Sequence, residues 1–441
     1  MRETLIRGGL VLPMDGRDAV RADVLLRDGA VAGVGDGLAA RNVLDAEGCL
    51  VTPGLVNTHH HLYQTLTRAV PGAQDAPLFD WLRRLYPVWG RMTPDDVGLA
   101  VRLGLCELAL SGCATTSDHH YLYPNGVRLD DTVEAAAEVG LRFHPTRGSM
   151  SIGEGAGGLP PDALVEDEAA ILRDCGRVID AFHDPAPGSM CRVGVAPCSP
   201  FSVSEGLMRD AAALARDRGV RLHTHLAENG EDVAYSLDRF GCRPGDYAER
   251  LGWVGADVWH AHCVKLDAAE VGLFGRTGTG VACCPCSNGR LGSGIAPLRG
   301  MLDAGVPVGF GVDGSASNDA GSLVDEARQA LLMQRAVHGP GGLSVAEAMR
   351  VATVGGARVL GRDDVGVLAP GMRADVAVWD MRGVEAAGSW DHAALLLAGP
   401  RRVRDLFVEG RRVVDGGRVA TVDLPVLVEQ ARAAVARLAD G

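Results

Sequence analysis

Pro53-Gly-Leu-Val-Asn-Thr-His-His-His61 is a short apolar run that ends on three consecutive histidines. Alternate side chains of an extended strand share one face, so His59 and His61 can reach one ion while His60 points away. Imidazole nitrogens suit zinc, and a zinc site with an open coordination position is catalytic. A single His-x-His pair could equally consist of ordinary polar residues near a strand end.

Further candidate ligands follow three later apolar runs, and they favour a metal site over unrelated polar residues. These segments are His223-Thr-His225-Leu-Ala-Glu228, His260-Ala-His262-Cys263 and Phe310-Gly-Val-Asp313-Gly-Ser315.

The middle of the chain alternates strand-like and helix-like patterns. Repeated β-α units predict an α/β fold with a (β/α)8 TIM barrel, in which chemistry lies at the C-terminal ends of the strands. Every candidate ligand falls at such an end. The predicted strands include residues 141–146, 191–197, 220–225, 258–262, 280–285 and 306–312.

Both ends of the chain have a different sequence pattern, in which short strand-like runs are separated by Asp-Gly and Glu-Gly turns. This pattern predicts one small β-sandwich domain built from both termini. The expected division is 1–53 for the first part of the sandwich, 54–364 for the barrel, 365–423 for the second part, and 424–441 for a C-terminal helix.

The composition excludes several partners. A net charge of -13 without a basic run argues against nucleic acid and anionic membranes. No apolar run reaches transmembrane length, and the N-terminus lacks a signal-peptide core. Eleven cysteines, an odd number in a long chain, indicate reduced thiols and a cytoplasmic location.

The sequence lacks the residues that several other kinds of catalytic or cofactor-binding site require. Lys265 is the only lysine, so there is no Walker lysine. The glycines of 153–158 match a dinucleotide fingerprint in form, but Leu159-Pro160-Pro161 follows them instead of a helix. No Gly-x-Ser-x-Gly elbow of a serine hydrolase is present. Cys283, Cys284 and Cys286 have no partner pair at zinc-finger spacing and are expected to be buried thiols.

The downstream motifs suggest roles, each with an alternative. His225 is the expected third ligand, although His223 on the other register could replace it. Glu228 is either a proton carrier over the metal or an acid at a helix N-terminus. Asp313 is either a ligand or a turn residue, since a core-facing carboxylate needs a cation or donors. His262 is a ligand, a hydrogen-bond partner of a bound water, or a buried structural histidine.

Taken together, these motifs resemble the amidohydrolase superfamily, in particular its cytosine/guanine deaminase and triazine hydrolase branch. The superfamily contains one-metal and two-metal members, and the latter are often bridged by a lysine on the fourth strand. Here that strand offers Cys198 and no lysine. The resemblance therefore implies one Zn²⁺ per chain, with Fe²⁺ as the alternative, held by His59, His61, His225 and Asp313.

Within this branch, six segments resemble bacterial 8-oxoguanine deaminases: 59–68, 85–89, 118–123, 146–151, 196–202 and 313–319. This resemblance implies a metal-dependent hydrolytic deaminase of a purine-like amino heterocycle, converting 8-oxoguanine to urate and ammonia. Glu228 would move protons, while His262 and Asp313 orient the attacking water. The alternatives are an s-triazine chlorohydrolase or aminohydrolase, a deaminase of isocytosine, guanine or a pterin, and a non-catalytic barrel.

Five residues are candidates for binding a small heterocyclic substrate. The amide of Gln64 can pair with a donor and an acceptor at once. Arg147 could supply fixed donors to an oxo group, and His120, Tyr121 and Trp89 are candidate walls. A homo-oligomer is the expected assembly.

Overall fold

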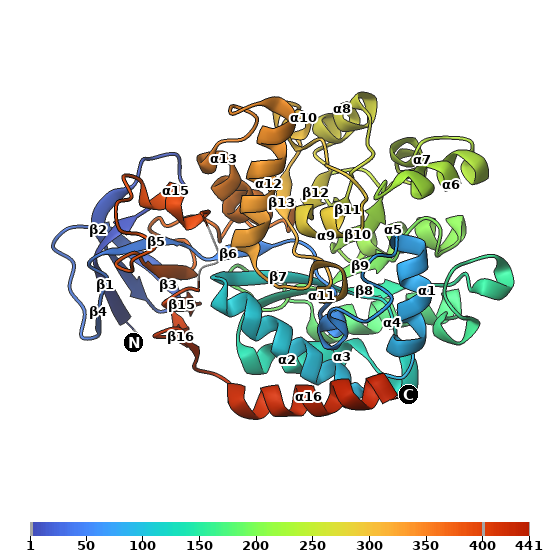
Figure 1. Cartoon of the computed structure of the whole chain (residues 1–441), viewed down its shortest axis with the longest axis horizontal. Coiled ribbons are helices and arrows are strands. Elements are labelled where there is room, and N and C mark those ends of the chain that lie inside the picture. Colours follow the sequence, from blue (N-terminus) through green and yellow to red (C-terminus); the bar gives the residue numbers. More distant parts are fainter. Residues whose placement is uncertain (1–2, 399–401, 441) are drawn as a thin grey trace.

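The structure, a computed structural model, describes residues 3–398 and 402–440 and consists of a parallel barrel and a second, separate sheet (Figure 1). The barrel has eight described strands, whose neighbours are all parallel. Thr58 closes the ring by donating its backbone N–H to the carbonyl of Phe310 at 2.9 Å. The strands are β6 (Leu55–Asn57), β7 (Cys113–His120), β8 (Arg142–Ser149), β9 (Gly194–Pro197), β10 (Arg221–Leu226), β11 (Val258–His262), β12 (Gly280–Cys283) and β13 (Val308–Phe310).

The second sheet combines the two ends of the chain, as the turn-rich pattern predicted. Its central pair is antiparallel, with Cys49 opposite Asp380 and Pro53 opposite Val376. The strands are β1 (Glu3–Val11), β2 (Val20–Arg27), β3 (Ala30–Gly35), β4 (Val43–Asp45), β5 (Cys49–Pro53), β14 (Val376–Asp380), β15 (Asp405–Val408), β16 (Arg411–Asp415) and β17 (Arg418–Val419). The predicted fold class is therefore confirmed, whereas the exact division at 53, 364 and 423 stays a prediction.

Helices cover the outside of the barrel, and α16 runs along its lower edge in Figure 1. The longer ones are α1 (Leu78–Trp89), α2 (Pro94–Leu110), α3 (Leu129–Val139), α4 (Glu168–Phe182), α5 (Glu205–Asp217), α6 (Gly230–Phe240), α8 (Ala268–Thr277), α12 (Leu323–His338) and α16 (Leu424–Asp440). The shorter ones are α7 (Pro244–Arg250), α9 (Pro285–Arg290), α10 (Leu298–Asp303), α11 (Ser315–Asn318), α13 (Val345–Arg350), α14 (Gly356–Val359) and α15 (His392–Leu396). Short 3-10 helices are η1 (Leu62–Thr67), η2 (Pro124–Gly126), η3 (Glu154–Ala156) and η4 (Asp162–Leu164), and η5 (Val351–Gly355) is a π-helical segment.

Trp379 of β14 fixes the small sheet against the barrel. Its indole N–H donates to Thr52, and its ring lies over Gly112, where a Cβ would come within 2.3 Å of the ring. Gly112 also has a φ of +80°, so both the space and the backbone call for glycine. A buried, two-bond ion pair between Arg142 and Asp375 joins β8 to the segment before β14.

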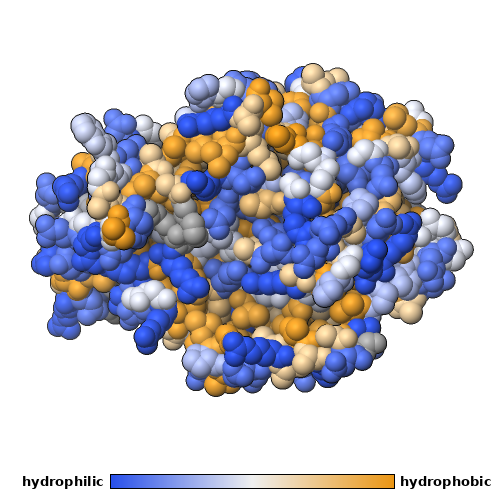
Figure 2. Space-filling model, in the orientation of Figure 1, coloured by the Kyte–Doolittle hydropathy of each residue, from blue (hydrophilic) through white to orange (hydrophobic). Residues whose placement is uncertain are grey.

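The distribution of apolar residues on the surface reflects the packing of α16. Figure 2 shows hydrophilic residues over most of one face and an apolar band above α16, where that helix packs against α2. Among the described residues, no helix combines the length and apolarity needed to cross a bilayer.

Candidate metal centre and active site

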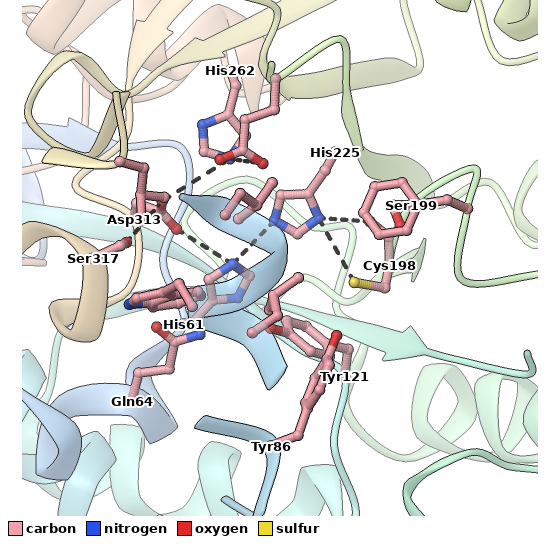
Figure 3. A pocket seen from close by; sticks show the side chains of 16 residues that line it. His61, Gln64, Tyr86, Tyr121, Cys198, Ser199, His225, His262, Asp313 and Ser317 are labelled. Atoms are coloured by element: carbon pink, nitrogen blue, oxygen red, sulfur yellow. Dashed lines mark hydrogen bonds and ion pairs between the residues drawn. The ribbon is translucent and has the colours of Figure 1, made fainter. Parts of the chain in front are cut away.

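The candidate ligands meet at the C-terminal end of the barrel, although they come from strands far apart in sequence. His59 and His61 follow β6, His225 lies in β10, and Asp313 follows β13. Asp313 Oδ1 lies 3.3 Å from Nε2 of His59 and 3.3 Å from Nε2 of His61. Nε2 of His61 lies 3.1 Å from Nε2 of His225. Figure 3 shows the labelled members of this group converging on one point.

Two of these imidazoles are oriented by backbone carbonyls. Nδ1 of His61 donates to the carbonyl of His119 at 2.7 Å, and Nδ1 of His225 donates to the carbonyl of Cys198 at 2.6 Å. A carbonyl can only accept, so each ring carries its proton on Nδ1 and leaves the Nε2 lone pair for an ion.

His59 is oriented through His223. Nδ1 of His223 donates to the carbonyl of Trp259 at 2.9 Å, which leaves its Nε2 as an acceptor. That Nε2 lies 2.8 Å from Nδ1 of His59. His59 therefore donates to His223 and directs Nε2 into the site, where this atom has no hydrogen-bond partner in the described structure. His223 lies behind His59 and supports it.

The protonation states suit a cation. Burial lowers the pKa of His59, His61 and His225, so their imidazoles are neutral lone-pair donors. Burial alone would raise the pKa of Asp313, but the adjacent imidazole of His59 and the other nearby histidines bring it well below its ordinary value. Three imidazole nitrogens and one carboxylate oxygen fit zinc. No cysteine belongs to either group of potential ligands found among the described residues.

Asp313 is held by the two loops around it. Its Oδ2 accepts hydrogen bonds from the hydroxyls of Ser287 at 2.6 Å and Ser317 at 3.2 Å, while Oδ1 accepts from the N–H of Gly314 at 2.7 Å. Asp313 and His262 have φ values of +60° and +68°, left-handed conformations that non-glycine residues rarely adopt. Strained backbone of this kind concentrates at functional sites.

Glu228 and His262 face each other beside this group. Nε2 of His262 lies 3.6 Å from Oε2 of Glu228 and 4.0 Å from Oδ2 of Asp313, and its Nδ1 lies 2.9 Å from Oδ1 of Asn288. Burial raises the pKa of Glu228 to about 7. Burial alone would lower the pKa of His262, but the carboxylates of Glu228 and Asp313 raise it. Glu228 can therefore exchange a proton at neutral pH.

A cavity that is open to solvent lies over these groups. Its polar side includes Gln64, Tyr121, Cys198, Ser199 and Ser317, several of which are labelled in Figure 3. Its other walls are apolar, and α1 supplies most of them. These wall residues are Leu78, Trp81, Leu82, Tyr86, Phe201 and Leu291.

The five substrate-binding candidates divide into two groups. Gln64 and Tyr121 line the cavity, and Oε1 of Gln64 is buried without a hydrogen-bond partner in the described structure. His120, Trp89 and Arg147 are not among its lining residues. His120 packs on the ring of Tyr63, and the indole of Trp89 donates to Thr67 at 3.0 Å.

Arg147 points away from the cavity and its donors are occupied. It forms ion pairs with Glu166 at 2.7 Å and Asp174 of α4 at 2.9 Å, and it stacks over Tyr123. Alternation along β8 turns this residue towards the surrounding helices. The strand is buried along its whole length, so its sequence carries no periodic signal for the inward face. A substrate-binding role for Arg147 stays a prediction, and the contacts of Arg147 with Glu166, Asp174 and Tyr123 do not favour it.

Sequence reasoning missed His119 and the residues that hold the site from behind. The ring of His119 stacks on His225 with centroids 4.8 Å apart, and its Nε2 donates to the carbonyl of Ala196. The two-residue period could have identified it, because His119 shares a strand face with Tyr121 and His120 does not. Ser287, Ser317 and Asn288 had no signal of this kind.

Comparisons with known proteins match the part of the chain that contains these site residues. The Amidohydrolase family profile matches residues 50–413. The chain is 45% identical to an 8-oxoguanine deaminase of Pseudomonas aeruginosa, over 100% of both chains. It is 39% identical to an isoxanthopterin deaminase of an unknown prokaryotic organism, over 99% of this chain and 97% of that protein. The crystal structure of an atrazine chlorohydrolase from Arthrobacter aurescens TC1, complexed with zinc, aligns with a TM-score of 0.94 at 35% identity, covering 98% of this chain and 100% of that one.

Proposed function

The chain belongs to the amidohydrolase family, as its motifs predicted, and on this premise we propose that it is a metal-dependent hydrolytic deaminase of a purine-like amino heterocycle. The observation that carries this proposal is a proton-exchanging carboxyl, Glu228, beside three imidazoles and Asp313 in one largely apolar cavity. Such a cavity would accept a flat ring and protonate it at one edge.

His59, His61, His225 and Asp313 are the proposed ligands of one Zn²⁺ per chain. Zinc, when bound in such a site, lowers the pKa of a water from about 15.7 to about 7. The buried, partnerless Nε2 of His59 supports this assignment, because buried polar atoms normally have partners.

The chain's own groups then handle the protons. His262 and Asp313 orient the attacking water through Nε2 and Oδ2. Glu228 passes the first proton of the water to the ring nitrogen next to the carbon that bears the amino group. It then takes the second proton from the hydroxyl added to that carbon and delivers it to the departing amine. The carbon–nitrogen bond breaks, ammonia leaves, and the ring carbon keeps the oxygen of water. A positioned acid/base of this kind contributes about 10²–10⁴-fold to the rate.

The main candidate substrate is 8-oxoguanine, with urate as the product, because the 45% identical relative is named for that activity. Gln64 offers an amide to the edge of the ring, and Trp81, Tyr86 and Phe201 offer apolar surface.

An s-triazine is the second candidate, and one contact favours it. The guanidinium of Arg147 is committed to Glu166 and Asp174, so it does not face the cavity to receive the oxo group of a purine. Arg147 is therefore not among the described residues that line the cavity, and the atrazine chlorohydrolase shares the fold.

The test is a release assay on protein reconstituted with Zn²⁺ or Fe²⁺, with metal content measured on the same preparation. The panel includes 8-oxoguanine, guanine, isocytosine, cytosine, isoxanthopterin and chloro- and amino-s-triazines. We expect ammonia and urate from 8-oxoguanine. Release of chloride or alkylamine from triazines instead would establish the second candidate, and a fully loaded protein inactive on the whole panel would leave a non-catalytic barrel.

The assembly state of the protein and its location in the cell are also part of the proposal. We expect a homo-oligomer in the cytoplasm, acting on a small molecule without nucleic acid or membrane. Light scattering coupled to size exclusion tests the assembly, and a monomer at micromolar concentration would contradict it.

A further inference from the structure

Glu326 is a buried carboxylic acid, and none of its hydrogen bonds to the described residues comes from a cationic side chain. It lies in the first turn of α12, and none of its surface is exposed. Its Oε2 accepts from the backbone N–H of Cys286 at 3.0 Å, and its Oε1 accepts from the side-chain amide of Asn318 at 2.6 Å. An acid in this turn favours the helix dipole, but both contacts point away from α12, so the dipole does not explain them.

The two partners of Glu326 lie on different helices, and both helices hold active-site residues. Cys286 is on α9, which also carries Ser287 and Asn288. Ser287 donates to Asp313, and Asn288 pairs with His262.

The second helix, α11, is tied to the same carboxylate of the metal site. It carries Ser317, whose hydroxyl donates to Asp313 and lies 2.9 Å from that of Ser287. Asn318 also donates to the carbonyl of Val312, the residue directly before Asp313.

We infer that Glu326 is a positioning residue, whose carboxyl group sets the spacing of α9 and α11 and thereby the orientation of Asp313 and His262. Each oxygen anchors one helix, so the distance between the helices depends on one rigid group. Partners of this kind, behind metal ligands, typically change affinity or activity about 10–100-fold when lost. Displacements near 1 Å at a reacting centre can cost about 10²-fold in rate.

Glu326→Gln is the informative variant because it keeps the shape and removes one acceptor. Both oxygens of a carboxyl group can accept a hydrogen bond whether or not it is protonated, but an amide nitrogen cannot. The NH₂ of Gln would therefore face either the N–H of Cys286 or the amide of Asn318, and two donors cannot pair. Asp325→Asn is the matched control. It removes an acid from the same helical turn, and no hydrogen bond links the Asp325 side chain to α9 or α11 in the described structure.

We expect Glu326→Gln to keep its zinc and a KM within about twofold of the original, while kcat falls about 10–100-fold. Hydrogen exchange measured by mass spectrometry should become faster in residues 284–290 and 314–319. Asp325→Asn should change none of these quantities. If Glu326→Gln does not fold, Asn318→Ala removes one of the two anchors and should show the same pattern more weakly.

Three results would overturn the inference: an unchanged kcat, a loss of kcat fully explained by lost zinc, or unchanged exchange in both segments. The kinetic comparison rests on the proposed deaminase activity, whereas hydrogen exchange and zinc content do not. An inactive original enzyme would therefore refute the proposed function, while the exchange data would still decide the role of Glu326.

Discussion

Gly314 leaves free the space that the side chain of Gln64 fills. A Cβ added to Gly314 would lie 1.8 Å from Oε1 of Gln64, far inside a contact distance. A side chain at position 314 would therefore push Gln64 out of its present position, although the two residues lie in opposite halves of the chain.

We expect Gly314→Ala to displace Gln64 and raise KM about tenfold or more, in line with the loss of a hydrogen bond worth about 1–2 kcal/mol. The same substitution in a Gln64→Ala background should have little further effect on KM, because the clash is then absent. Steady-state kinetics of the four proteins tests this. Additive effects would contradict the contact, and loss of zinc in Gly314→Ala would place the damage at Asp313.

Glu228→Gln should retain zinc and lose about 10²–10⁴-fold in kcat, because the amide cannot donate and recover a proton. Metal analysis and ammonia release on the same sample measure both quantities. Turnover close to that of the original enzyme would remove Glu228 from the proton pathway.

Substitutions of His223 and His61 should affect zinc binding to different degrees. His61→Ala removes a proposed ligand and should abolish zinc binding at micromolar metal, together with activity. His223→Ala removes the group behind His59 and should weaken zinc binding about 10–100-fold, so that excess zinc restores activity. Titration with a competing chelator separates the two variants. Equal zinc loss in both, without rescue, would make His223 a ligand.

Arg147→Gln separates packing from substrate binding. Since the guanidinium neutralises Glu166 and Asp174 in a buried position, the variant should unfold at a lower temperature with KM nearly unchanged. Thermal melts and kinetics provide the two readouts. A large rise in KM with an unchanged melting temperature would instead support substrate contact.

The pH dependence of stability should report the buried acid on α12. Burial raises the pKa of Glu326 to about 8, so the folded chain keeps this proton at pH values where the unfolded chain, with an ordinary pKa near about 4.3, has released it. Its contribution to stability is therefore complete at low pH and is lost as the pH rises towards about 8. Between about pH 5 and pH 8, the melting temperature of the original protein should fall more steeply than that of Glu326→Gln. Parallel curves would contradict the shift.

Many of the candidate site residues could be predicted from the sequence because they lie at the ends of strands. The His-x-His spacing of 59 and 61, the Glu228 position three residues after His225, and Asp313 after a valine-rich run all rely on local geometry. The family comparison agrees with the fold and the class of enzyme that these motifs indicated.

Substrate candidates were less predictable for a definite physical reason. β7 and β8 are buried on both faces, so polar and apolar residues do not alternate along them. Without that signal, His120 and Arg147 looked as accessible as Tyr121. The structure shows that alternation places His119 and Tyr121 inward and turns Arg147 towards α4.

By itself, the sequence determined the strand ends that carry the ligands, the lack of a lysine on the fourth barrel strand, and the presence of an acid beside the site. Only the tertiary structure decided which histidine of 223 and 225 faces the candidate metal centre, which candidate wall residues line the cavity, and which contacts Gly314 and Glu326 make. Those answers depend on contacts between residues far apart in the chain, such as His59 with His223 or Glu326 with Cys286. Closure of the barrel creates such contacts, and no local pattern encodes them.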